Sequence, residues 1–344
     1  MGVLATASSS REPALAEGPD ALATLLASLH EDMEACNRAI VARMDSPVAL
    51  IPQLAAHIVA AGGKRLRPLL TLAAARLCGY QGGQRHVNLA ACVEFIHTAT
   101  LLHDDVVDES RLRRGLASAN AVFGNKAPVL VGDFLFTRAF QLMIEDGSLS
   151  VLQILSHAAA TIAEGEVLQL VTQHDLATTE ERYLEVVRGK TAALFAAACE
   201  VGAVVAGRPP AEENALATYG MDLGIAFQLV DDALDYAADE RVLGKTVGDD
   251  FREGKITLPI LIAYAAGNTE ERAFWSRTLE VGEQTEADLP RAMELLARHD
   301  AIAATLGRAA RFVRSAQDAL DIFPHSEMRQ ALIDVAAYTV DRAS

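Results

Sequence analysis

The sequence predicts an all-α protein that folds as one large domain, and three observations support this prediction. Apolar residues recur at the i, i+3, i+4 spacing of a helix along nearly the whole chain, whereas alternating runs typical of strands are scarce. Hydrophobic residues make up 51% of the 344 positions, which suits a sizeable helical core. No internal linker is long enough to divide the chain. We therefore expect ten or more apolar helices stacked around a deep central cleft.

Start and stop signals place the helices in order along the chain. Pro128 suits the first turn of a helix, and Thr178-Thr179-Glu180-Glu181 resembles a capping box. The segment Gly-Arg-Pro-Pro at 207–210 forces a break. The expected helices span residues 21–44, 48–61, 66–77, a long segment that ends at Asp108, a helix from Pro128 to about Ile144, then 150–173, 179–206, 211–237 and 259–266, followed by three shorter helices to Arg342.

The chain ends and the apolar segments indicate a protein that does not cross a membrane. Residues 1–20 contain Ala, Ser and Pro without a continuous apolar segment, so we expect a mobile N-terminal tail followed by one domain over residues 21–344. The most apolar later stretch, residues 192–207, is interrupted by Glu200 and is too short to span a bilayer.

Charge and cysteine content exclude some classes of function. A net charge of −16 argues against nucleic acid as a partner, because a phosphate backbone requires clustered Lys and Arg. Local basic clusters still permit small phosphorylated substrates. The four cysteines lie in separate apolar stretches without a CxxC pair, so they are expected to be buried free thiols in a reducing, cytoplasmic environment.

The first candidate site is an acidic triplet at the end of a long apolar run. Asp104, Asp105 and Asp108 occupy positions i, i+1 and i+4, so they lie close together on a helix. Like charges at this spacing repel one another unless a cation neutralises them. Oxygen ligands favour a hard ion such as Mg2+, which also binds substrate phosphates. A single triplet of this kind is also compatible with a solvated acidic helix end.

A second triplet argues against that simpler interpretation. Asp231, Asp232 and Asp235 repeat the same spacing 127 residues later (231 − 104 = 127), again after an apolar run, in which Gln228 is embedded. Two such triplets at the ends of apolar helices could face one another across a cavity and hold metal ions between them.

Basic residues cluster near these triplets in the sequence. Lys64 and Arg67 lie beside a glycine pair before a helix, where an anion is favoured, and Arg113-Arg114 follow the first triplet. His97, two turns before Asp104, is by itself better explained as a core histidine. The Gly-Lys-Thr segments 189–191 and 244–246 lack the upstream glycine of a P-loop, so we interpret Lys190, Lys245 and Lys255 as separate phosphate ligands.

Together these motifs resemble a known family. Two DDxxD motifs, GGKRLRP at 62–68, RRG at 113–115, FQLVDDALD at 227–235 and GKTVGDDFREGK at 244–255 are similar to those of trans-isoprenyl diphosphate synthases. The similarity covers roughly residues 21–342. The segment VEFIHTAT at 93–100 also resembles the long-chain branch, which makes quinone side chains. The resemblance implies an isoprenoid-synthase-type helical bundle around a deep central cavity.

The resemblance also implies a role for each motif residue. The two triplets would bind up to three Mg2+ ions that hold an allylic diphosphate, either farnesyl or geranylgeranyl diphosphate. Arg113, Lys190, Gln228, Lys245 and Lys255 would contact that diphosphate, and Thr191 would flank the reacting carbons. Isopentenyl diphosphate would be held by Lys64, Arg67, His97 and Arg114.

Product length is the finer question that the resemblance raises. The growing chain would run along the first acidic helix, past Thr100 and Ala99, positions that tend to be aromatic in relatives with short products. Small side chains there favour a C40 to C50 product, with Ile96 or Leu155 as the floor of the tunnel. The alternatives are a geranylgeranyl or farnesyl synthase, a terpene cyclase and a non-catalytic partner subunit. The family is usually homodimeric, and a water-insoluble product would allow transient contact with a membrane.

Overall fold

The computed structural model describes residues 21–342 except 61–62, 64, 114–115 and 238–246. The expected N-terminal tail and three candidate ligands, Lys64, Arg114 and Lys245, therefore lie outside the described residues.

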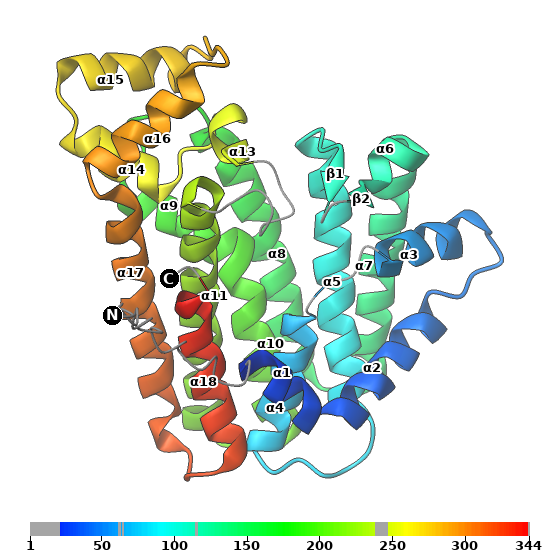
Figure 1. The fold of residues 1–344 in the computed structure, drawn as a ribbon. Coiled ribbons are helices and arrows are strands. Elements are labelled where there is room, and N and C mark those ends of the chain that lie inside the picture. The colour runs from blue at the N-terminus through cyan, green and yellow to red at the C-terminus, as the bar shows by residue number, and fades with distance from the viewer. Residues whose placement is uncertain (1–20, 61–62, 64, 114–115, 238–246, 343–344) are drawn as a thin grey trace, which may run out of the picture.

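The predicted all-α class is confirmed, and most elements are helices (Figure 1). In chain order the first half contains α1 (Ala21–Ser28), α2 (His30–Arg43), α3 (Leu50–Ala60), α4 (Leu66–Leu77), α5 (Arg85–Val107), strands β1 (Leu112–Arg113) and β2 (Leu116–Ala117), α6 (Ala119–Phe123), α7 (Lys126–Asp146) and α8 (Leu149–Thr172). The second half contains α9 (Glu180–Val187), the π-helical turn η1 (Arg188–Ala192), α10 (Ala193–Val205), α11 (Pro210–Ala237), α13 (Asp249–Arg252), α14 (Leu258–Ala266), α15 (Thr269–Trp275), the π turn η2 (Ser276–Glu280), α16 (Asp288–Arg298), α17 (Ala301–Ala319), the 3-10 turn η3 (Leu320–Ile322) and α18 (Glu327–Asp341).

Helix α10 lies at the centre of the bundle. Eleven of its thirteen residues are buried, because α4, α5, α8 and α11 all pack against it. On one side α5 packs against α7 and α2, and on the other α11 packs against α17 and α18. The short helices α14, α15 and α16 gather at one end of the bundle (Figure 1). This arrangement brings α5 and α11, the carriers of the two acidic triplets, to opposite sides of α10.

Several expected boundaries were wrong for identifiable reasons. The expected helix over residues 21–44 is broken at Leu29, whose φ of −115° leaves the helical range. The hairpin β1–β2, paired antiparallel through Leu112 and Ala117, was missed because two-residue strands are too short to show alternation. The chain after residue 266 forms four α-helices instead of three, and α17 is 19 residues long.

Helix α7 meets the length and hydropathy criteria for a membrane-spanning helix, although no such helix was expected from the sequence. Within the described part of the chain, it is the one helix long and apolar enough to cross a membrane. Its inner residues, including Val131, Leu135 and Leu142, nevertheless belong to the core, and α7 packs along α5. The outer face of α7 also carries exposed apolar residues, among them Leu130 and Ile144.

Two glycines allow the central helices to approach closely. A Cβ on Gly220 of α11 would lie 2.3 Å from the carbonyl oxygen of Phe195 in α10, and a Cβ on Gly202 would lie 2.6 Å from the Cβ of Ala74 in α4. Both distances are far shorter than any normal contact, and the neighbours are backbone or short side chains that cannot move aside. Glycine is therefore a packing requirement at these crossings.

We predict opposite effects of the same substitution at two helical glycines. Gly220→Ala should lower the free energy of unfolding by about 1–3 kcal/mol, because the added methyl group separates α10 from α11. Gly307→Ala in α17, where a Cβ meets nothing within 4 Å, should raise it by about 0.5–1 kcal/mol through helix propensity. Urea unfolding monitored by circular dichroism measures both, and equal changes in the same direction would contradict the packing explanation.

Candidate active site

Both acidic triplets lie at the C-terminal ends of long helices. Asp104 and Asp105 occupy the last turn of α5, and Asp108 is its C-cap residue. Asp231, Asp232 and Asp235 occupy the last two turns of α11. Because the C-terminal end of a helix carries a partial negative charge, each triplet adds anionic groups where they are already disfavoured. Cations must therefore supply the stabilisation.

Three predicted basic residues surround the first triplet. Arg113 places Nε 2.7 Å and Nη2 2.6 Å from Oδ1 of Asp105, which is almost fully buried. Lys190 from η1 lies 3.9 Å from Asp104, and Lys255, which follows α13, lies 3.5 Å from Asp108. Segments far apart in the sequence thus meet at one end of α5.

Burial and neighbouring charge shift the ionisation of this cluster. Burial raises the pKa of Asp104, and Lys190 opposes that rise. Burial lowers the pKa of Lys255, but the carboxylates of Asp250, Asp108 and Glu253 outweigh it and raise that pKa above its ordinary value. Lys255 therefore stays protonated at neutral pH and remains available to an anionic ligand.

Glu166 of α8 belongs to the site and was missed by the sequence analysis. Lys190 donates to its Oε2 at 2.7 Å, and burial raises the pKa of Glu166 to about 7, with Lys190 opposing the rise. Gly165 and Gly189 allow this contact, since a Cβ on Gly165 would lie 2.5 Å from the backbone nitrogen of Lys190. The only signal in the sequence was a charged residue beside a glycine in an apolar helix.

The second triplet is organised around Asp232. Its Oδ1 accepts a hydrogen bond of 2.7 Å from Gln228, its Oδ2 accepts one from the hydroxyl of Tyr183, and Thr191 donates to Gln228 at 2.8 Å. Burial, with the nearby charge of Asp250, raises the pKa of Asp232 to about 8. This chain of bonds links η1 and α9 to α11. Tyr183, which sequence reasoning did not single out, holds Asp232 in place.

The other two acids of this triplet have different surroundings. The side chain of Asp231 is 43% exposed and accepts a hydrogen bond of 2.6 Å from Arg342, whose guanidinium stacks on Phe227 at 4.4 Å. Asp235 accepts a bond of 3.2 Å from the backbone nitrogen of Asp250. Asp232 is buried and both of its oxygens are bonded to protein groups, whereas Asp231 and Asp235 are less buried.

Two residues predicted to hold isopentenyl diphosphate lie close together, with His97 two turns before Asp104 on α5. Nη1 of Arg67 is 3.1 Å from Nε2 of His97, and the Arg67 guanidinium stacks on Phe195 at 4.4 Å. His97 also lines a hollow of about 40 Å³ together with Arg65 and Phe95. The structure thus places His97 beside a cation and a hollow, which favours the ligand interpretation over the core interpretation.

The four residues predicted to govern chain length lie in the interior. Ala99 and Ile96 of α5 and Leu155 of α8 are fully buried, while Thr100 is half-buried and donates its hydroxyl to the carbonyl of His97. Both α5 and α8 pack against α10.

The acidic residues fit a magnesium site that the substrate helps to complete. Among the described residues, no three His, Cys, Asp or Glu side chains converge as a preformed cage. Mg2+ commonly binds one or two carboxylates, several waters and substrate phosphates, so it does not require such a cage. Asp104, Asp108, Asp231 and Asp235 offer oxygen ligands only, which is the appropriate chemistry for this ion.

Comparison with known proteins gives a consistent result over most of the chain. The family model "Polyprenyl synthetase" matches residues 48–296. The octaprenyl diphosphate synthase of Escherichia coli (strain K12) is 49% identical over 312 residues, which are 91% of this chain and 96% of that relative. The corresponding protein of Haemophilus influenzae is also 49% identical, over 90% of this chain and 94% of that relative.

Solved structures agree with this assignment. A decaprenyl diphosphate synthase from Rhodobacter capsulatus superposes with a TM-score of 0.90 at 54% identity, covering 94% of this chain and 99% of that one. A polyprenyl synthase from Caulobacter crescentus CB15, complexed with calcium and isoprenyl diphosphate, gives a TM-score of 0.91 at 53% identity, with 94% and 98% covered. With the paired triplets and their basic partners, these similarities show that the chain belongs to the polyprenyl synthetase family and is a prenyltransferase.

Proposed function

We propose that this protein condenses isopentenyl diphosphate head-to-tail onto an allylic diphosphate in a Mg2+-dependent reaction and repeats the step to give an all-trans C40 to C50 diphosphate for quinone side chains. The observation that carries the proposal is that Lys190 and Lys255 reach the first triplet, while Thr191, beside Lys190, is linked through Gln228 to Asp232 of the second. The similarity to octaprenyl and decaprenyl diphosphate synthases supports the long product.

The residues around the triplets suit ionisation of the allylic substrate. Mg2+, when bound, neutralises the diphosphate and stabilises the charge that it gains as the C1–O bond breaks. Arg113, Lys190 and Lys255 add positive charge on the same side, and Lys190 is positioned by Glu166. Arg67 and His97 hold isopentenyl diphosphate so that its double bond attacks the allylic cation at C1. A proton is then lost to the released diphosphate, which leaves a product five carbons longer.

The interior below Asp104 suits a long hydrocarbon product. Ala99 lies five residues before Asp104 and is fully buried, with a side chain too small to stop a passing chain. The buried Ile96 lies about 4.5 Å further along the helix axis and Leu155 comes from α8, so either residue can limit further growth. Apolar walls also keep water away from the allylic cation.

The exposed apolar face of α7 and α8 supports a homodimer. Leu130 and Ile144 of α7 are 67% and 69% exposed, and Leu149 and Val167 of α8 are 76% and 61% exposed. The residues of each helix share one side of it, and exposed apolar faces of this kind are typical of subunit interfaces. The four free, buried cysteines fit a cytoplasmic location.

Loss of one carboxylate from either triplet should abolish most of the activity. Asp104→Asn and Asp231→Asn should each lower kcat/KM by at least about 100-fold, because metal-assisted charge stabilisation contributes several kcal/mol. The matched control is Asp318→Asn, an exposed site on α17. The assay follows labelled isopentenyl diphosphate with farnesyl diphosphate and Mg2+. Full activity in both triplet variants would refute the proposed site.

A bulky residue at position 99 should shorten the product. Ala99→Phe places a ring across the path of the growing chain, so chromatography of the dephosphorylated alcohols should show shorter chains than the C40 to C50 alcohols expected of the wild type. Ala121→Phe at an exposed position of α6 serves as the control and should leave the product unchanged. A wild-type product that stops at C15 or C20 would mean that the tunnel floor is misassigned.

A charge on the outer face of α7 should dissociate the dimer. Ile144→Asp should convert the protein to a monomer, since a buried unpaired carboxylate at an interface is strongly unfavourable. Val122→Asp, at another exposed apolar position, on α6, should leave the mass unchanged. Size-exclusion chromatography with light scattering gives the mass directly. A monomeric wild type would rule out the dimer.

A further inference from the structure

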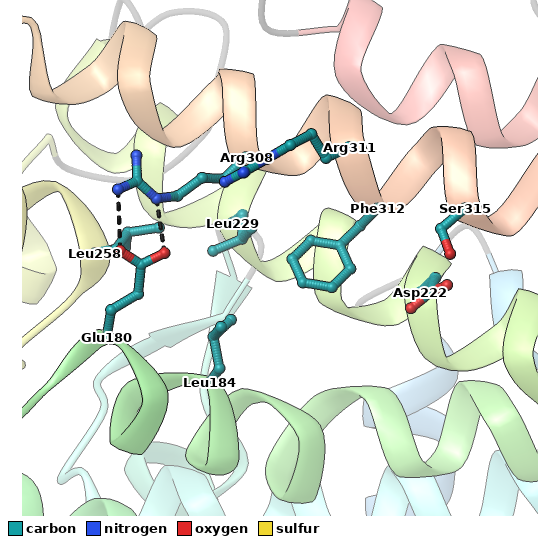
Figure 2. A pocket seen from close by; sticks show the side chains of 9 residues that line it. All are labelled: Glu180, Leu184, Asp222, Leu229, Leu258, Arg308, Arg311, Phe312 and Ser315. Atoms are coloured by element: carbon teal, nitrogen blue, oxygen red, sulfur yellow. Dashed lines mark hydrogen bonds and ion pairs between the residues drawn. The ribbon is translucent and has the colours of Figure 1, made fainter.

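A second cavity lies between α9, α11, α14 and α17, and none of the six triplet aspartates lines it (Figure 2). Its volume is about 360 Å³, within the range of sites that bind small molecules. Four apolar side chains form its walls, namely Leu184, Leu229, Leu258 and Phe312. None of the residues that line it takes part in the catalytic cluster, so it is a separate site.

The acidic groups at the two ends of the cavity already have partners. At one end Glu180 accepts hydrogen bonds from Nε and Nη2 of Arg308 at 2.7 and 3.0 Å (Figure 2). At the other end burial raises the pKa of Asp222, while a hydrogen bond with Ser315 and the charge of Arg188 oppose the rise. Glu180 is therefore neutralised by Arg308, whereas burial disfavours the charged form of Asp222.

Of the two arginines at the cavity, Arg308 is paired with Glu180 and Arg311 has no such counterpart among the described residues. Arg311 lies on α17 between Arg308 and Ser315, is exposed, and forms no ion pair with any residue that the structure describes. An arginine at the rim of an apolar cavity suits a carboxylate or phosphate, which its guanidinium binds through paired hydrogen bonds. The cavity thus combines apolar walls with one available cation.

We propose that this cavity binds a small amphiphile with one anionic head group, whose apolar chain packs between Leu184 and Phe312 while its head pairs with Arg311. The head group is a carboxylate, as in a fatty acid, or a phosphate, as in a phosphorylated alcohol. The inference goes beyond prenyl transfer and does not rest on it.

The test is calorimetric titration of the full-length protein without Mg2+ or substrates. The probes are decanoate, decyl phosphate and decan-1-ol, which share one chain length and differ in the head group. The variants are Arg311→Gln, which removes the charge, and Ser315→Phe, which fills one end of the cavity. Arg314→Gln is the matched control, because Arg314 is an exposed arginine on the same helix that does not line the cavity. Thermal unfolding confirms that each variant is folded.

We expect one molecule of decanoate or of decyl phosphate to bind per chain. The probe that binds with the higher affinity identifies the head group as a carboxylate or a phosphate. Arg311→Gln should weaken that binding about tenfold, the effect of losing a charge-assisted hydrogen bond, and Arg314→Gln should not. Ser315→Phe should also weaken it. Three results would each overturn the proposal. Decan-1-ol could bind as tightly as the anionic probes, both arginine variants could lose affinity equally, or Arg311→Gln could bind the anionic probe as tightly as the wild type. If Ser315→Phe fails to fold, the comparison of the two arginine variants decides alone.

Discussion

The structure depends on the concentration of negative charge at the ends of two helices. Six aspartates lie in or just after the last turns of α5 and α11, where the helix dipoles are also negative. Such an arrangement is stable only if cations from elsewhere in the chain reach it. Arg113, Lys190, Lys255 and Arg342 do so, and they come from four separate segments. The site is therefore complete only when these four segments are packed together.

Close helix packing makes that assembly possible. Glycines at 165, 189, 202 and 220 allow α8, η1, α4 and α11 to approach α10 or one another more closely than any side chain would permit. The π-helical turn η1 interrupts the long segment from α9 to α10 at the point where Lys190 and Thr191 are needed. Lys190 then faces Glu166 and Asp104, while Thr191 bonds to Gln228. One irregular turn thus connects both triplets.

The two triplets share a spacing but not an environment. Asp105, the middle residue of the first, is neutralised by Arg113 eight residues later along the chain. Asp232, its counterpart in the second, is held by the neutral groups of Tyr183 and Gln228 and is buried. The charge on Asp232 is therefore less stabilised, and its pKa is raised to about 8 by burial and by Asp250. In the second triplet Asp231 and Asp235 are less buried than Asp232.

The sequence by itself determined the helical class, the two acidic triplets and most of their basic partners, because helix periodicity and i, i+4 spacing are local properties that can be read along the chain. It could not reveal Glu166, Tyr183 or Arg342, which are single polar residues whose meaning depends on what lies opposite them. Nor could it show that Asp232 is enclosed while Asp231 is open, since burial follows from the packing of α9 and α18 against α11. Local sequence patterns therefore indicated the chemistry of the site, whereas long-range packing determined which side chains are in contact.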